Sequence, residues 1–193
     1  MTREIARERK VATLLFADLA DFTSLGEAHD PEVVSALVAG TFERLSRVVE
    51  DHEGTIEKFA GDAMLAVFGV PVSHEDDPER AVRAGLAMQA AMAEMGAASG
   101  GRVELALRIG IETGEVLVDH ARLGGERDLF VTGDAVNVAA RLEAAADPGS
   151  VVVGPGAHEA TRSAVEYEEL APLGLKGKST AVTAFRATGA GPR

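Results

Sequence analysis

Two short apolar runs, each associated with an aspartate at a strand end, constrain this chain more than any other feature. Residues 11–18 predict a buried strand that ends at Asp18, and residues 55–68 predict a hairpin whose turn is Gly61-Asp62. An ionised carboxylate is costly to bury without a partner, so Asp18 needs one. Asp62 has two interpretations, a solvated turn residue or the second member of an acidic pair. If the two strand ends meet, the pair forms a hard oxygen site suited to Mg²⁺ or Mn²⁺.

Two helix starts are marked by an acid followed by proline. Residues 30–32 and 77–79 both carry Asp-Pro-Glu, which predicts helices over 31–50 and 79–97. The acidic cluster at 74–77 contains a histidine and is conceivable as a metal site, but its cap-then-proline pattern favours a helix start. The other elements that we expect are strands at 11–18, 103–112, 115–119, 151–153, 166–173 and 181–186, helices at 135–146 and 154–163, and an exposed loop or hairpin arm at 120–128. A turn at Thr113-Gly114 is expected between the strands at 103–112 and 115–119. Strands and helices alternate without a strict βαβ order, which indicates an α+β domain with a mixed sheet.

Composition excludes several classes of protein. The chain has 193 residues with 46% apolar content, enough for one domain or two small ones. A formal charge of −12 disfavours a nucleic-acid-binding surface, and the absence of cysteine excludes disulfides, zinc-thiolate sites and cysteine nucleophiles. No apolar stretch reaches the roughly 18 residues needed to span a bilayer, and the charged amino terminus shows no signal peptide. We therefore expect a soluble cytoplasmic protein or a soluble piece of a larger one.

The two ends of the chain carry weaker signals. Residues 1–10 are a charged lead-in, read either as the end of a linker or as a frayed terminus. Residues 188–193 are expected to be a flexible tail.

Several motifs occur in a fixed order along the chain. They are Leu15-Phe16-Ala17-Asp18, Phe22-Thr23, Glu57-Lys58-Phe59-Ala60-Gly61-Asp62, Arg108-Ile109-Gly110-Ile111 with Thr113-Gly114, the segment 133–141, and Leu175-Lys176-Gly177-Lys178. Together they resemble the catalytic domain of the class III nucleotidyl cyclases, the adenylyl and guanylyl cyclases. The resemblance covers Val11 to Arg186. It implies one catalytic domain over 11–187 with an α+β fold, in which helices flank a mixed, mostly antiparallel, ferredoxin-like (palm-type) sheet.

The resemblance implies a reaction and a metal site. In the family, the 3′-hydroxyl of ATP attacks the α-phosphorus to give 3′,5′-cyclic AMP and pyrophosphate. Such transfer depends on charge neutralisation and in-line positioning, which two Mg²⁺ or Mn²⁺ ions per site supply. The family's metal site falls on Asp18, Leu19 and Asp62. Phe22 and Thr23 fall where backbone N–H groups would hold the phosphates.

Three further residues match family positions that act on the ribose or the phosphates of the substrate. Asn137 and Arg141, four apart on an expected helix, match the pair that stabilises the transition state. Lys176 matches the lysine that contacts the triphosphate, with Lys178 as a second choice. Judged from the residues alone, Arg141 is an ordinary solvated arginine, Asn137 a residue near a helix cap, and the two lysines a basic turn.

Base recognition is where the chain departs from the family. Lys58 matches the position that reads the base, and lysine there goes with adenine, whereas guanylyl enzymes tend to carry glutamate. The second base-reading position is Phe130, where the family usually has Asp or Thr, and a phenyl ring cannot accept a hydrogen bond from the adenine amino group. Asp128 substitutes only if its loop shifts. Asp21, where the family commonly has glycine, adds an acid close to the polyphosphate.

The resemblance also implies a partner. The family works as a head-to-tail dimer, so a homodimer of this chain would form two sites, each with the acids of one copy and Lys58, Asn137, Arg141 and Lys176 of the other. We therefore predict a homodimeric adenylyl cyclase domain that acts on ATP, and the resemblance leaves open a regulatory domain elsewhere in a longer parent chain. The alternatives are a catalytically weak or silent cyclase-like nucleotide-binding or dimerisation module, which Phe130 and Asp21 favour, or a cyclase with relaxed base selectivity.

Overall fold

A single mixed sheet organises the domain. The computed structural model describes residues 6–20, 30–98, 105–123, 126–174 and 181–191. The strands run in the order β2-β3-β1-β4-β6-β8-β7, with β5 paired to β4. Their bounds are β1 Ala6–Ala20, β2 Thr55–Ala60, β3 Ala63–Phe68, β4 Ala106–Leu123, β5 Glu126–Thr132, β6 Val151–Val153, β7 Val165–Glu169 and β8 Phe185–Ala190. Only β4 and β6 pair in parallel among the described strands, which confirms the predicted α+β class with a mostly antiparallel sheet.

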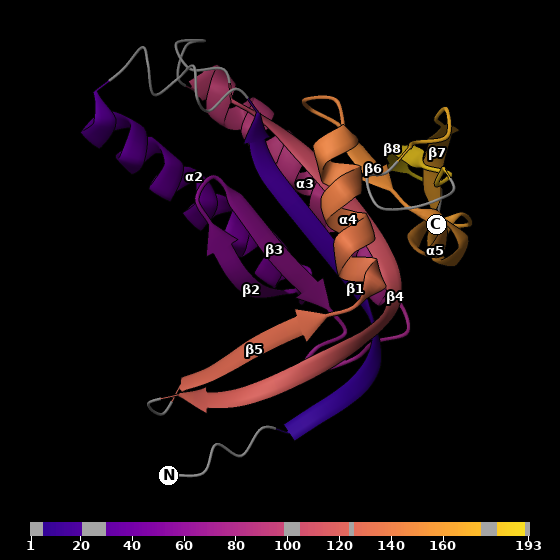
Figure 1. The fold of residues 1–193 in the computed structure, drawn as a ribbon. Coiled ribbons are helices and arrows are strands. Elements are labelled where there is room, and N and C mark those ends of the chain that lie inside the picture. The colour runs from indigo at the N-terminus through magenta and orange to yellow at the C-terminus, as the bar shows by residue number, and fades with distance from the viewer. Residues whose placement is uncertain (1–5, 21–29, 99–104, 124–125, 175–180, 192–193) are drawn as a thin grey trace.

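Helices cover both faces of the sheet (Figure 1). Their bounds are α2 Pro31–Asp51, α3 Asp77–Ala98, α4 Asp134–Ala145 and α5 Pro155–Thr161. Leu15, Ala17 and Leu19 of β1 project into the core that α2 and α3 close. On the opposite face, Leu14 packs with the β4–β5 arm and with Ala135 and Ala139 of α4. Because side chains alternate along a strand, Phe16 and Asp18 project from the same face as Leu14.

A glycine lets α4 lie directly against β4. A Cβ atom on Gly110 would stand 2.2 Å from the Glu143 nitrogen and 2.3 Å from the Ala139 carbonyl oxygen. Any side chain at this position would therefore push the helix away from the sheet. The close approach brings Glu143 onto the face of the sheet from which Asp18 projects.

The two long central strands differ from what the sequence predicts. We expected a turn at Thr113-Gly114 to separate strands at 103–112 and 115–119. This prediction is wrong, because β4 continues from Ala106 to Leu123. β1 accompanies it over its whole length, from Ala6 opposite His120 to Ala20 opposite Ala106. A hydrogen bond of 2.8 Å between the hydroxyls of Thr13 and Thr113 joins the strands where the turn was expected.

Both ends of the described chain carry more strand than expected. β1 begins at Ala6, inside the charged lead-in, where its backbone pairs with β4, and Arg7 and Arg9 add exposed ion pairs of 2.9 Å and 2.8 Å with Asp119 and Glu115. β8 spans Phe185–Ala190 rather than 181–186, so it includes residues 188–190 of the expected tail. Its partner β7 ends at Glu169, four residues before the expected end.

The remaining predicted elements agree with the structure within a few residues. The hairpin of β2 and β3 turns at Gly61-Asp62, where Gly61 has a φ of 64° that suits glycine. Asp30 caps α2 by accepting the Glu32 N–H at 2.9 Å. Across the described residues, no helix combines the length and the apolar character required to cross a membrane.

Candidate active site

The two strand ends that carry aspartates meet. Asp18 is the register partner of Ala63 on β3, and the Leu19 N–H donates to the Asp62 carbonyl at 3.0 Å. Asp62 directly precedes the register partner of Asp18, so the two carboxylates lie at adjacent strand ends, and the charge on Asp62 raises the pKa of Asp18. Of the two interpretations of Asp62, the acidic pair is therefore the one that the geometry favours.

Asp18 has an environment that disfavours its charged form. Burial raises the pKa of Asp18 above its ordinary value, and the neighbouring Asp62 raises it further, while Arg108 and the Leu19 N–H act in the opposite direction. The Oδ1 atom of Asp18 is buried and accepts no hydrogen bond from the described residues. A buried carboxylate oxygen without a donor is costly, and it identifies a place where a cation would be stabilised.

Sequence analysis missed the roles of Arg108 and Glu143 in this cluster. Arg108 lies opposite Asp18 on β4, so both project from the same face of the sheet. Glu143 projects from α4 toward them, and burial, Asp18 and Asp62 together raise its pKa to about 7, with Arg108 opposing. Arg108 stands in the motif Arg108-Ile109-Gly110-Ile111, which was quoted for the resemblance without a role for its arginine. Glu143 follows Arg141 by two residues and carried no signal of its own.

The residues present fit a divalent metal. The carboxylates of Asp18 and Asp62 are hard oxygen donors at adjacent strand ends, and one oxygen has no described partner. Leu19, the third residue of the predicted metal site, differs from the two acids because its side chain is buried in the core. Only its backbone carbonyl could reach a cation.

The predicted transition-state pair lies outside this cluster. Asn137 is exposed on α4 and Arg141 is partly exposed, one turn further along the same helix. The helix buries Ala135, Val138 and Leu142 instead. Within one chain, α4 therefore turns Glu143 toward the acids and presents Asn137 toward solvent.

The predicted base-reading residues lie on neighbouring strands. Lys58 is exposed on β2, and the side chain of Phe130 on β5 leaves that residue 46% exposed. The two strands β2 and β5 are in contact. Phe22, Thr23 and Lys176, with Asp21 and Lys178, lie outside the described residues, and so does the side chain of Asp128.

Comparison with known proteins identifies the family. The sequence profile described as the adenylate and guanylate cyclase catalytic domain matches residues 5–186. The chain belongs to this family. "Adenylate cyclase 1" of Rhizobium meliloti is 34% identical over 185 residues, which are 94% of this chain and 28% of that protein. "Guanylate cyclase soluble subunit beta-2" of Rattus norvegicus is 30% identical over 183 residues, 93% of this chain and 26% of that one.

Solved cyclase structures share the fold of this cyclase domain. The adenylyl cyclase CyaB from P. aeruginosa superposes with a TM-score of 0.87 at 27% identity, over 95% of this chain and 96% of that one. The guanylyl cyclase Cya2 gives 0.85 at 33% identity, over 95% and 94% of the two chains. The chain spans about a quarter of the length of the two curated relatives named above. Both kinds of cyclase match, so the comparisons support a cyclase without choosing the base.

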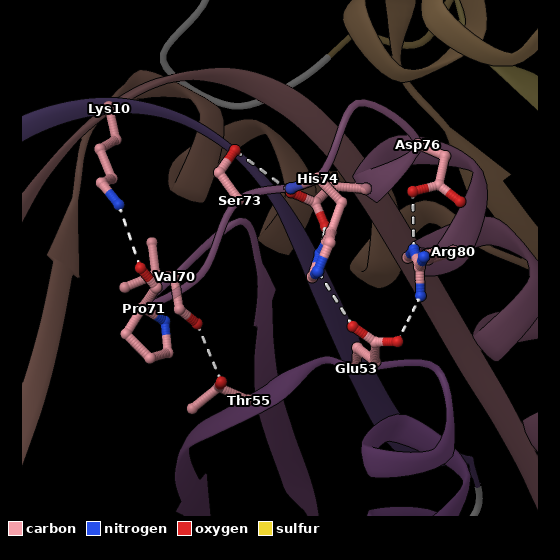
Figure 2. A network of polar contacts seen from close by, with 10 residues as sticks. Lys10, Glu53, Thr55, Val70, Pro71, Ser73, His74, Asp76 and Arg80 are labelled. Carbon is pink, nitrogen blue, oxygen red and sulfur yellow. Dashed lines mark hydrogen bonds and ion pairs between the residues drawn. The ribbon is translucent and has the colours of Figure 1, made fainter.

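A second charged cluster of the cyclase domain is fully paired and lies at the start of α3 (Figure 2). Glu53 contacts His74 Nε2 at 3.0 Å with one oxygen and Arg80 at 3.0 Å with the other. Asp77, whose side chain is 6% exposed, accepts the His74 N–H at 2.7 Å and contacts His74 Nδ1 at 3.2 Å. Arg80 also pairs with Asp76 at 2.7 Å. Among the described residues, no three or more His, Asp and Glu side chains are grouped to hold a metal, at 74–77 or elsewhere, so the alternative of a metal site at 74–77 gains no support and the Asp18–Asp62 site rests on its pair of acids alone.

Proposed function

We propose that this cyclase domain converts ATP to 3′,5′-cyclic AMP and pyrophosphate at sites shared between two copies of the chain. The observation that carries the proposal is the meeting of Asp18 and Asp62 at adjacent strand ends, with one buried carboxylate oxygen left without a described donor. Such an arrangement is unfavourable for the empty protein and suits a site for cations. The names of the relatives support a cyclase reaction.

Asp18 and Asp62 would hold Mg²⁺ or Mn²⁺, two ions per site. Bound there, the ions would lower the charge of the polyphosphate and help the 3′-hydroxyl to attack the α-phosphorus. Arg108 holds one positive charge beside the acids and limits their mutual repulsion. Asp18 and Asp62 sit on paired strands of a rigid sheet, so their positions are set before substrate arrives.

Asn137 and Arg141 would act on the substrate bound by the other copy. Both side chains lie on the α4 surface that the sheet does not cover, where a second molecule can reach them. Arg141 would place donors on the negative charge that develops at phosphorus, and Asn137 would orient the ribose. Lys176 would contact the triphosphate, and backbone N–H groups near Phe22 and Thr23 would hold the phosphates.

Lys58 favours adenine in this proposal. An ammonium is a donor only, and the adenine ring has acceptor nitrogens on the edge where guanine carries an N–H. Phe130 is the feature that favours the second candidate, a catalytically weak nucleotide-binding module or a cyclase with relaxed base selectivity, because its half-exposed ring offers no acceptor. A cytoplasmic location and a regulatory domain in a longer parent chain stay predictions.

Complementation between two inactive variants tests the shared site. We expect Asp18→Asn and Arg141→Ala each to lose about 10²–10³ in rate, because each removes a group that acts on the reacting phosphate. Mixing them in equal amounts should restore roughly a quarter of the wild-type rate, because random pairing makes half the dimers mixed and each mixed dimer has one intact site of two. Cyclic AMP and cyclic GMP are measured separately with Mn²⁺ and each nucleotide. No recovery on mixing would refute the shared site, and equal rates with ATP and GTP would refute adenine preference.

A further inference from the structure

A bulge in β2 places two charged residues side by side. Ile56 pairs with Ala66 and Lys58 pairs with Leu65, so Glu57 between them has no partner on β3. In a regular strand, neighbouring side chains point to opposite faces. The extra residue of a bulge breaks this alternation and re-aims a side chain, and bulges are frequent beside active sites.

The bulge creates an ion pair between adjacent residues. The Lys58 ammonium lies 3.1 Å from Glu57 Oε2 and donates to Oε1 at 3.4 Å, so it sits near both carboxylate oxygens. The two partners differ sharply in exposure, 1% for the Glu57 side chain and 54% for that of Lys58. Oε2 accepts no well-directed hydrogen bond from any residue that the structure describes. The buried carboxylate thus faces an ammonium whose other side is open to solvent.

The pair lies on the face of the sheet that carries the acids. Lys58 is opposite Leu65, and Leu65 is opposite Phe16. Partners in antiparallel strands project from the same face, and Asp18 follows Phe16 by two residues, so it shares that face. Without the bulge, Ile56 and Lys58 would project from the same face, and Lys58 would lie beside Ile56 against the core that α2 and α3 close.

We propose that Glu57 is a positioning residue that holds the Lys58 ammonium in place for base recognition and so sets the preference of the site for adenine. The proposal rests on the proposed function, since it takes Lys58 as the residue that reads the base. Glu57 does not meet the nucleotide itself, because its side chain is enclosed.

The contact that holds the Lys58 ammonium against the Glu57 carboxylate, which we call the tether, would improve base selectivity by fixing the directions of the ammonium's N–H donors. A lysine ammonium has three donors, and a flexible four-carbon stem lets it follow almost any acceptor. When the ammonium directs N–H groups at the Glu57 carboxylate, its remaining N–H has a fixed direction and points outward. A fixed donor favours the ring acceptor of adenine and meets an N–H on guanine, whereas a free ammonium adapts to either base.

The test compares Glu57→Gln with the wild type and with Glu79→Gln. Glutamine keeps the size of the buried side chain but loses the charge that attracts Lys58. We expect KM for ATP to rise about fivefold to tenfold, kcat to change less than twofold, and the ratio of kcat/KM for ATP to that for GTP to fall about tenfold. Glu79 is the control because it also pairs with a cation, Arg83 at 2.6 Å, but on α3 rather than on β2. Its variant should match the wild type in all three quantities.

A double-mutant cycle separates positioning from a merely structural role. In a Lys58→Met background, Glu57→Gln should leave KM and the ATP-to-GTP ratio unchanged, because there is no ammonium left to position. Lys58→Met alone leaves a buried carboxylate without its partner, so its melting temperature should fall, and adding Glu57→Gln should restore most of the loss.

The outcomes distinguish this inference from the proposed function. Wild-type selectivity in Glu57→Gln, or an equal effect of Glu57→Gln in the presence and absence of Lys58, would overturn the tether. If the wild type forms no cyclic nucleotide, the proposed cyclase function fails, and calorimetric binding of ATP and GTP to the same variants decides the tether. Equal affinities of wild type and Glu57→Gln for both nucleotides would then refute it, and a loss of ATP preference that depends on Lys58 would support it.

Discussion

Two charged clusters in this domain use the same kinds of side chain but differ in how their charges are paired. At the start of α3, the acids Glu53, Asp76 and Asp77 all contact His74 or Arg80. At the end of β1, three carboxyls, those of Asp18, Asp62 and Glu143, act on one another with Arg108 as the cation that opposes them. Each cluster has three acids and one arginine, but in the first, which we call the balanced cluster, every acid contacts His74 or Arg80, whereas the second, the unbalanced cluster, leaves Asp18 Oδ1 without a described donor.

The difference separates a structural role from a functional one. The paired cluster joins the turn at Glu53 to the first turn of α3, and its hydrogen bonds are complete without a ligand (Figure 2). The acidic cluster leaves Asp18 Oδ1 buried without a described donor and raises the pKa of two carboxyls. A folded chain tolerates such imbalance where a ligand later relieves it, so unpaired acid indicates the site better than the number of charges does.

The largest expected effect comes from neutralising an acid in the unbalanced cluster. Asp18→Asn keeps the shape of the side chain and removes its charge. We expect cyclase activity to fall by about 10²–10³ because the developing charge at phosphorus loses its cation site. The melting temperature of the metal-free variant should equal or exceed that of the wild type, because a buried charge and its repulsion with Asp62 are removed.

Activity and thermal unfolding of the same preparation check this prediction together. Arg162→Ala, which breaks an exposed pair with Glu159 on α5, is the control and should change neither quantity. A destabilised Asp18→Asn variant would place Asp18 with the structural acids and contradict the comparison.

A substitution in the balanced cluster should have the opposite effect, lowering stability and leaving activity nearly unchanged. Asp77→Ala removes a buried acceptor of the His74 N–H and one of the two carboxylates that contact the His74 ring. We expect the free energy of unfolding to fall by about 2–3 kcal/mol, because the backbone N–H loses its partner and the small side chain leaves a space. Turnover per folded molecule should change less than twofold. Asp76→Ala, at the exposed edge of the cluster, should cost under about 1 kcal/mol in chemical denaturation.

Most of the architecture could be predicted because it depends on local patterns. The proline-marked start of α2, the hairpin at Gly61-Asp62 and the short strand β6 follow from capping, turn chemistry and apolar runs. The continuity of β4 through Thr113-Gly114 could not be predicted that way. It depends on pairing with β1 more than ninety residues earlier, and a Thr-Gly dipeptide is compatible with either a turn or a strand.

The residues of the candidate site, too, could be predicted only where a local sequence pattern marks them. Asp18 and Asp62 were identifiable because each follows or interrupts an apolar run, and the motifs of the family reinforce them. Glu143 and the Glu57–Lys58 pair were not, because their importance arises from contacts between elements. Glu143 reaches the acids because α4 lies close to β4 at Gly110. Glu57 contacts Lys58 because of a register shift in β2 that no sequence pattern predicts.

The smallest effect that we predict concerns the protonation of Glu143. Its pKa is raised to about 7, chiefly by burial and then by Asp18, whereas in the unfolded chain it titrates near 4.5. Between these values the folded state holds a proton that the unfolded state has lost, so the free energy of unfolding falls as the pH rises from about 5 to 7. Partial exposure limits the loss to about 2 kcal/mol. Glu143→Gln, neutral at every pH, should reduce that slope in metal-free urea denaturation, leaving the part due to the raised pKa of Asp18, whereas the exposed Glu94→Gln should keep the whole slope. A slope unchanged in Glu143→Gln would show that α4 does not add a third acid to the cluster, and Asp18 and Asp62 alone would then account for its excess of negative charge.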